Sequence, residues 1–222
     1  MDYSPVLISV KTAAVSIFFT FFLGIFAAWG VVSIQNNKLR TIVDGVLILP
    51  LVLPPTVAGF FLLAVVGLKG PVGQFFLEYF AVKIAFSWEA TVLAAVVMSF
   101  PLMYRSARGA FEQVNENIIY AARTLGMSEW DIFWKIRIAV ALPGVASGGI
   151  LAYTRGLGEF GATAMIAGNI AGKTRTLPIA IYGAVAQGDD GSALNYVLVI
   201  LLISFLAITL MNYFTIKQYK MR

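Results

Sequence analysis

The chain has 222 residues, of which 59% are hydrophobic and 12% are charged, and its net charge is +5. Soluble domains are about 25% charged, and several runs here are long enough to cross the roughly 30 Å of hydrocarbon in a bilayer, so a soluble protein is excluded. The chain has neither cysteine nor histidine, which excludes disulfides and removes the commonest general base and metal ligand. These absences count against an enzyme. The basic residues form no continuous stripe, so no nucleic-acid partner is expected.

Two apolar segments near the start of the chain predict two membrane-spanning helices. Residues 12–34 carry no charge and are far longer than the core of a signal peptide, so we expect them to remain in the membrane. Residues 45–68 contain Pro54 and Pro55, and proline inside a helix frees an upstream carbonyl and bends the axis. Pro54, Pro55 and Thr56 are candidates for the wall of a transport path. A packing kink without substrate contact is the alternative, and the pattern alone favours it.

The third apolar segment, residues 85–104, predicts another span. It follows a mixed connector at 69–86, and Trp88 occupies the position of an interfacial anchor. Arg105 and Arg108 mark the point where the chain leaves the membrane. A charged excursion therefore begins directly after this span.

The most charged loop, residues 115–143, predicts two short amphipathic helices around a glycine. The first has apolar side chains at i, i+3, i+4 and i+7, on one face: Ile118, Ala121, Ala122 and Leu125. Gly126 can end this helix in a left-handed turn, and Ser128 with Asp131 three residues later starts the second helix as a capping pair. The apolar side of the second helix consists of Ile132, Phe133, Ile136 and Ile138. Small alanines on an exposed face would let another protein approach closely, whereas a helix lying on lipid headgroups is the alternative.

The fourth predicted span, residues 138–166, contains two opposite charges. Arg155 and Glu159 lie four residues apart, on one helical face, and charges at membrane depth usually face a bundle interior or water. Arg155 is a candidate guide for an anion along a transport path. A structural pair, in which the two charges neutralise each other, is the simpler interpretation. Gly158 is a candidate hinge, with close helix packing as the alternative.

The remaining segments complete the predicted fold. Residues 169–191 form a connector, in which residues 177–185 predict a short helix or a re-entrant turn. Residues 193–216 carry no charge and predict a fifth span. We therefore expect an all-α protein: one polytopic membrane domain over residues 1–222, with about five transmembrane helices and a loop of two short helices at about 112–138.

Basic residues are distributed unequally between the two sides that five spans create. One side collects Lys38, Arg40, Arg105, Arg108, Arg123, Lys135, Arg137, Lys217, Lys220 and Arg222, and the other collects Lys69, Lys83, Lys173 and Arg175. Cytoplasmic loops carry the excess of Lys and Arg. The count predicts that the 115–143 loop and the C-terminus are inside and the N-terminus outside.

The 115–143 loop resembles the cytoplasmic coupling loop of ABC importer permeases, whose pattern is Glu-Ala-Ala, three residues, Gly, nine residues and Ile-x-Leu-Pro. Ala121, Ala122, Gly126 and Ile136 match that pattern in register, while Tyr120 stands where the family usually has Glu. The resemblance covers nearly the whole chain. Residues 47–59, 86–112 and 154–182 look like the membrane subunit of a molybdate importer.

The resemblance implies a permease subunit that forms a transport path by alternating access in the cytoplasmic (inner) membrane of a bacterium or archaeon. Its implied partners are a second copy of the chain, two cytoplasmic ABC ATPase subunits, a periplasmic or extracellular oxyanion-binding protein and membrane lipid. No cofactor is expected on this chain, because ATP and Mg²⁺ would bind the ATPase. The residues expected to contact the ATPase are Tyr120, Ala121, Ala122, Leu125, Gly126, Met127, Ser128 and Ile136. Those expected on the transport path are Pro54, Pro55, Thr56, Arg155, Gly158 and Glu159.

Several alternatives remain open at the level of sequence. Tungstate and sulfate are chemically close to molybdate, and no set of residues distinguishes one tetrahedral oxyanion from another. An intramembrane enzyme would have to use Asp44 and Glu159, which lie on different spans with nothing in the sequence to bring them together. A channel or an ion-coupled carrier would work without an ATPase, and the exposed coupling loop argues against it.

Overall fold

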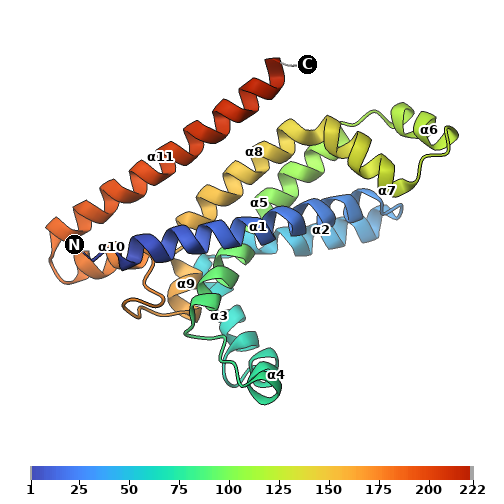
Figure 1. The fold of residues 1–222 in the computed structure, drawn as a ribbon. Helices are drawn as coiled ribbons and strands as arrows, with labels where there is room; N and C mark the ends of the chain where they lie inside the picture. Colours follow the sequence, from blue (N-terminus) through green and yellow to red (C-terminus); the bar gives the residue numbers. More distant parts are fainter. Residues whose placement is uncertain (1, 221–222) are drawn as a thin grey trace.

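The computed structural model describes the backbone of residues 2–220 and the side chains of residues 2–209 and 212, and this part of the chain contains helices and no strands (Figure 1). Four continuous helical stretches are long and apolar enough to cross a membrane. They are α1 (Ser4–Val32), α5 (Trp88–Glu112), the stretch Glu129–Leu157, and α11 (Asp190–Lys220) as far as Thr209. A bent pair, α2 (Asn37–Val52) and α3 (Pro55–Val66), makes a fifth. The predicted all-α fold with about five spans is confirmed.

Shorter elements lie at the two ends of the spans. They are α4 (Pro71–Phe80), α6 (Glu116–Thr124), α9 (Gly161–Ile166) and α10 (Leu177–Ala186). The stretch Glu129–Leu157 itself consists of α7 (Glu129–Ile132), the π-helix η1 (Phe133–Arg137) and α8 (Ile138–Leu157). Helices α6 and α7 lie at one end of the molecule, far from α4, α9 and α10 (Figure 1). The segment 177–185 lies within α10, which packs against α11 and α1. The 115–143 loop is thus at the opposite end of the molecule from α4, α9 and α10.

Helices α1, α5 and α8 form the centre of the molecule. Two hydroxyl pairs join α1 to α5: Thr12 Oγ1 lies 2.9 Å from Thr91 Oγ1, and Thr20 Oγ1 lies 3.0 Å from Ser99 Oγ. Both pairs are buried and advance by the same number of residues along each helix, so α1 and α5 run in the same direction. Hydroxyl groups have few other partners in lipid, and such bonds are worth about 0.6 kcal/mol on average. They fix the register of the two helices.

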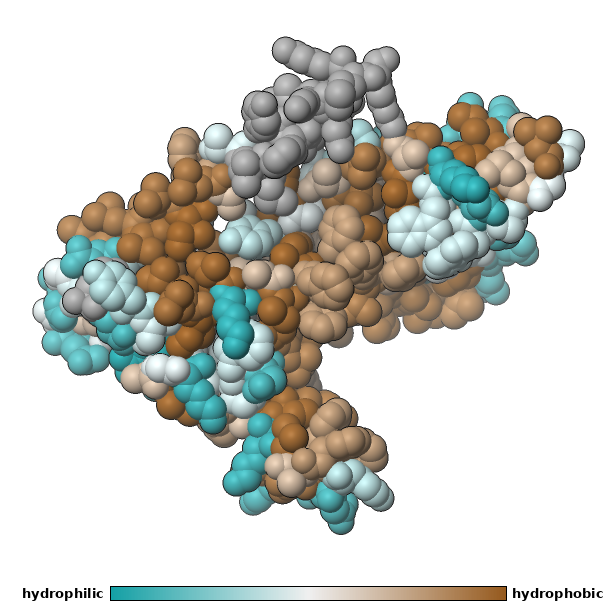
Figure 2. All heavy atoms as spheres, in the orientation of Figure 1, coloured by the Kyte–Doolittle hydropathy of each residue, from teal (hydrophilic) through white to brown (hydrophobic). Residues whose placement is uncertain are grey.

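The outer face of α1 is apolar and exposed. It presents Phe18, Phe19, Phe22, Leu23 and Phe26, all more than a third exposed. Figure 2 shows apolar surface along the middle of the molecule and hydrophilic residues gathered at its ends. This distribution is that of a bundle surrounded by lipid, with polar ends in water.

Two spans differ from uniform rods. The chain bends by 111° between α2 and α3, as the prolines of the second segment predicted. The prediction of one fourth span over residues 138–166 is wrong at its end, because α8 stops at Leu157 and α9 is a separate helix. A buried carboxylate lies at the interruption: Glu159 accepts a hydrogen bond of 2.8 Å from the backbone N–H of Ala162, in the first turn of α9.

Candidate coupling surface and transport path

The loop between α5 and α8 folds as two short helices joined by a glycine. Asn115 caps the start of α6, accepting a hydrogen bond of 2.9 Å from the N–H of Asn117. Gly126 has φ = +80°, the left-handed conformation that glycine adopts without steric cost. The N–H of Met127 then donates to the carbonyl of Ala122 at 3.1 Å. The predicted helix–glycine–helix arrangement is confirmed.

Ser128 starts the second helix as the sequence predicted. Its hydroxyl accepts from the N–H of Asp131 at 3.1 Å and donates to the Asp131 carboxylate at 2.7 Å. Helix α7 then continues through the π-helix η1 directly into α8. Single π-turns inside helices are rare and frequently mark functional sites. The second short helix is therefore one end of a membrane span.

The two faces of α6 have different environments. Ile119 and Ala122 are buried against the core, whereas Ile118, Ala121 and Leu125 are exposed, with Leu125 83% exposed. The expectation that both alanines face outward is wrong for Ala122, because the C-terminal turn folds this side of α6 onto the protein. We call the exposed residues Ile118, Ala121 and Leu125 the α6 stripe. It is an apolar surface with no partner among the described residues, of the kind that marks an interaction site.

An ion pair joins α6 to α7, and an aromatic cluster attaches this unit to the bundle. Arg123 donates to both oxygens of Glu129, at 2.6 and 3.1 Å, and this carboxylate raises the pKa of the Arg123 guanidinium. The ring of Phe133 is buried and stacks 4.5 Å from the ring of Trp29 at the end of α1. Met127 and Ile136 pack partly buried against the same core. The loop is thus a packed unit.

A second group of charges ties α2 to the end of α5, and sequence reasoning missed it. Glu112 pairs with Arg40 and, at 2.9 Å, with Arg108, while Arg108 also pairs with Asp44. The hydroxyl of Tyr104 donates to Asp44 at 2.7 Å. The spacing of Arg108 and Glu112, four residues apart, was the one local signal in the sequence.

The predicted path residues of the second span lie where it bends. Pro54 precedes α3 and Pro55 is its first residue, so their missing N–H groups fall where a helix has no partner for them anyway. Pro54, Pro55 and Thr56 are all exposed. Helix α3 packs closely on α9: a Cβ on Gly161 would lie 2.8 Å from the Cβ of Pro55.

The predicted pair in the fourth span is present. Arg155 Nη1 lies 2.5 Å from Glu159 Oε2, and the Glu159 side chain is 1% exposed. Gly158 follows α8 directly and is exposed. The structure thus brings the start of α9, to which Glu159 is bonded, against Pro55, whereas the residues predicted for coupling lie at the other end of the molecule. Contact of any of these residues with substrate stays a prediction. Within residues 2–220, no three carboxylates form a group that could hold a metal ion.

Comparison with known proteins places this architecture in a family. Residues 20–217 match the model of the family described as "Binding-protein-dependent transport system inner membrane component". The chain belongs to this family of transport permeases.

Its relatives include proteins named for molybdenum transport. The molybdenum transport system permease protein ModB of Escherichia coli K12 is 43% identical over 194 residues, which cover 86% of this chain and 84% of that protein. ModB of Haemophilus influenzae is 35% identical over 221 residues, covering 99% and 96%. The putative molybdenum transport system permease protein YvgM of Bacillus subtilis is 42% identical over 205 residues, covering 92% and 89%.

Solved structures confirm the fold. A chain of the inward-facing MetNI methionine ABC transporter superposes with a TM-score of 0.75 at 16% identity, covering 95% of this chain and 93% of that one. A chain of a bacterial ABC transporter for the acidic polysaccharide alginate gives 0.77 at 13% identity, covering 96% and 78%. At these identities the likeness concerns the fold alone.

Proposed function

We propose that this chain is the permease subunit of an ATP-driven importer of molybdate. The observation that carries the proposal is the 35–43% identity to molybdenum transport permeases over at least 86% of the chain. Tungstate is the nearest alternative cargo, because it is also a tetrahedral dianion, and sulfate is the next.

The proposed importer contains two copies of this chain, two cytoplasmic ATPase subunits and a binding protein on the outer side. The family description, with its binding protein and inner membrane, supports this assembly. ATP and Mg²⁺ belong on the ATPase subunits. The coupling loop and the C-terminus lie in the cytoplasm and the N-terminus outside, as the distribution of Lys and Arg predicts.

The proposed mechanism is alternating access driven from the coupling loop. The α6 stripe docks on the ATPase, whose closure on ATP displaces α6 and α7. Because α7 continues into α8, the displacement reaches the bundle along one continuous helix. Helix α8 ends at Leu157, the carboxylate of Glu159 just beyond it binds the start of α9, and α9 packs on α3. A movement at the cytoplasmic end is thereby transmitted to the opposite end of the path.

Uptake measurements test the cargo and the class together. Cells that produce this chain with its ATPase and binding protein should accumulate labelled molybdate, and omission of the ATPase should abolish the uptake. Excess tungstate should compete strongly and excess sulfate weakly. Uptake that persists without the ATPase would favour a channel or carrier, and stronger competition by sulfate than by tungstate would reassign the cargo.

The glycine turn offers a matched test of coupling. No atom lies within 4 Å of a Cβ placed on Gly126, so a side chain there acts only through its φ of +80°. Gly126→Val should distort the turn and reduce uptake while ATP hydrolysis continues. Gly126→Asn should retain most of the uptake, because asparagine tolerates the left-handed region. Equal uptake by the valine variant and the unmodified protein, at equal expression, would refute the docking role of the loop.

A further inference from the structure

A groove of 460 Å³ lies between α5 and α8 in the cytoplasmic half of the bundle, away from the residues predicted for the path. Its walls are Arg105, Ser106, Gly109, Ala110, Gln113, Val140, Ala141, Pro143, Gly144 and Ser147. A Cβ on Gly144 would lie 2.7 Å from that of Ala110, and one on Gly148 2.6 Å from that of Ser106, so the floor is a close contact between antiparallel helices. The groove extends from Gln113 at the cytosolic mouth inward to Arg105, about 12 Å along α5.

Arg105 differs from the other arginines of the described chain. Six of them have a carboxylate or amide partner: Arg40, Arg108, Arg123, Arg137, Arg155 and Arg175. Among the side chains of residues 2–209 and 212, that of Arg105 is exposed and has neither an ion pair nor a hydrogen bond through its guanidinium. Its five N–H donors are free in a geometry that suits tetrahedral oxyanions.

The charges around Arg105 do not cancel. Arg40, Arg105 and Arg108 face two carboxylates, those of Asp44 and Glu112. Each carboxylate is already held by direct bonds, Asp44 by Arg108 and Glu112 by both Arg40 and Arg108, and Arg105 acts on Asp44 only through space. One positive charge is left over, and it belongs to Arg105. An uncompensated charge at the edge of a low-dielectric bundle attracts anions.

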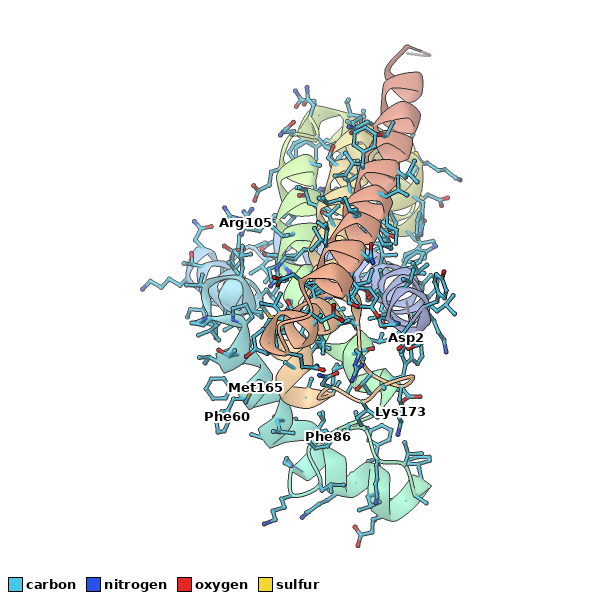
Figure 3. The ribbon with its side chains drawn as sticks, turned by 90° about the vertical axis from the view of Figure 1, so that its left-hand side faces the viewer. Asp2, Phe60, Phe86, Arg105, Met165 and Lys173 are labelled. Atoms are coloured by element: carbon cyan, nitrogen blue, oxygen red, sulfur yellow. The ribbon has the colours of Figure 1, made fainter. Side chains whose placement is uncertain are left out.

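Further donors line the same groove. The Ser106 hydroxyl and the Gln113 amide lie along it, whereas the Ser147 hydroxyl is bound to the carbonyl of Pro143 at 2.9 Å. Figure 3 shows Arg105 on the same side of the molecule as Phe60 of α3 and Met165 of α9, and Asp2, before α1, on the other side. Arg105 therefore lies on the side of the molecule that also carries Phe60 of α3 and Met165 of α9.

We propose that this groove is an exit site where the transported oxyanion is bound before release into the cytosol, with Arg105 as its main contact. The proposal rests on the proposed function, since it takes its ligand from it. The same chemistry would suit a lipid phosphate. The hydroxyl and amide donors along the groove favour a small oxyanion, which can reach both Arg105 and Ser106.

Cysteine labelling tests the site without requiring transport. The chain has no cysteine, so Ser147→Cys places its one thiol on the groove wall. In nanodiscs of neutral lipid, an anionic thiosulfonate should label this thiol faster than a cationic one, and millimolar molybdate or tungstate, but not chloride, should slow labelling severalfold. Arg105→Gln should remove both effects and Arg105→Lys should retain part of them. Asn117→Cys, on the exposed side of α6, is the matched control and should show neither effect.

Each opposite outcome overturns the proposal. Protection that survives Arg105→Gln would show that Arg105 is not the contact, and absence of protection would show that no oxyanion binds. Labelling blocked by added anionic phosphatidylglycerol, and not restored by molybdate, would assign the groove to lipid. An unreactive thiol in the neutral nanodisc would assign it to an interface with a second copy.

Uptake separates this proposal from the proposed function. Molybdate uptake by the unmodified chain with its ATPase reports on the function itself. The ratio between Arg105→Gln and the unmodified chain reports on the groove, and we expect about a tenfold lower rate, the effect of one lost hydrogen bond to a charged group. Lys38→Gln removes the same charge from the exposed start of α2 and should change uptake little. An equal effect of the two variants would contradict a specific site.

Discussion

Two spans of this permease are interrupted, and they are interrupted by different means. Between α2 and α3 the break occurs at Pro54 and Pro55, which lack the N–H groups that a continuous helix needs. Between α8 and α9 no proline is present at the break, and a buried carboxylate, Glu159, caps the second helix and pairs with Arg155 on the first. The first break follows from the covalent structure of proline itself, whereas the second depends on a charged side chain and its neighbours.

The helices that follow the two breaks, α3 and α9, nevertheless depend on each other. A Cβ on Gly59 would lie 2.7 Å from the Cα of Ala162 and 2.8 Å from the Cβ of Met165. Because α3 and α9 approach so closely, displacing either one displaces the other. Because α9 holds α3 in place, the break at the prolines should tolerate substitution. The break at Glu159 depends on its charge pair and should not.

The largest effect is expected from separating the charges of the second break. Arg155→Met leaves the Glu159 carboxylate buried without its cation, which typically costs about 3–5 kcal/mol of stability. The double variant Arg155→Met, Glu159→Gln removes both charges and keeps an acceptor for the Ala162 N–H, so it should be more stable than the single variant. Thermal unfolding in detergent measures both. A double variant less stable than the single one would show that the pairing is not what holds this break.

An intermediate effect is expected at the contact between α3 and α9. Gly59→Ala should destabilise the protein by about 1–3 kcal/mol, because the added methyl meets the backbone of α9. Gly45→Ala makes the same substitution within the same interrupted span, where no atom lies within 4 Å, and it should be neutral or slightly stabilising. Similar unfolding temperatures for the two variants would mean that α3 and α9 are not in close contact.

The smallest effect is expected at the prolines themselves. Pro54→Ala should change stability by less than about 1 kcal/mol, mainly through the greater freedom of the unfolded chain. The bend should persist, because α9 holds α3 in place. Spin labels at Ile42 and Leu68, both exposed, would report the angle as a distance. A clearly longer distance in the alanine variant would show that the prolines alone impose the bend.

The sequence predicted the features that one residue type imposes on its own neighbourhood. The left-handed turn at Gly126, the cap at Ser128 and the bend at Pro54 each follow from the local chemistry of one side chain or its absence. The sequence did not predict the end of α8 at Leu157, since a glutamate four residues after an arginine is equally compatible with a continuous helix.

Features made by distant residues were beyond local reasoning. Arg40 and Glu112 are 72 residues apart, and nothing in the sequence indicates that they meet. The inward turn of Ala122 depends on the core beneath it, and the groove beside Arg105 depends on how α8 crosses α5. The apolar periodicity of α6 correctly marked a helix, although one part of that face meets the protein and the other is exposed.

The two hydroxyl pairs between α1 and α5 have a mechanical consequence. Sliding one helix past the other by a single turn would break both pairs and leave the Thr12 and Thr20 hydroxyls without the partners they have on α5. Helices α1 and α5 should therefore move together as one rigid unit whenever the transporter changes state. The relative motion must then occur elsewhere, at the contact between the glycine-rich side of α8 and this rigid pair of helices.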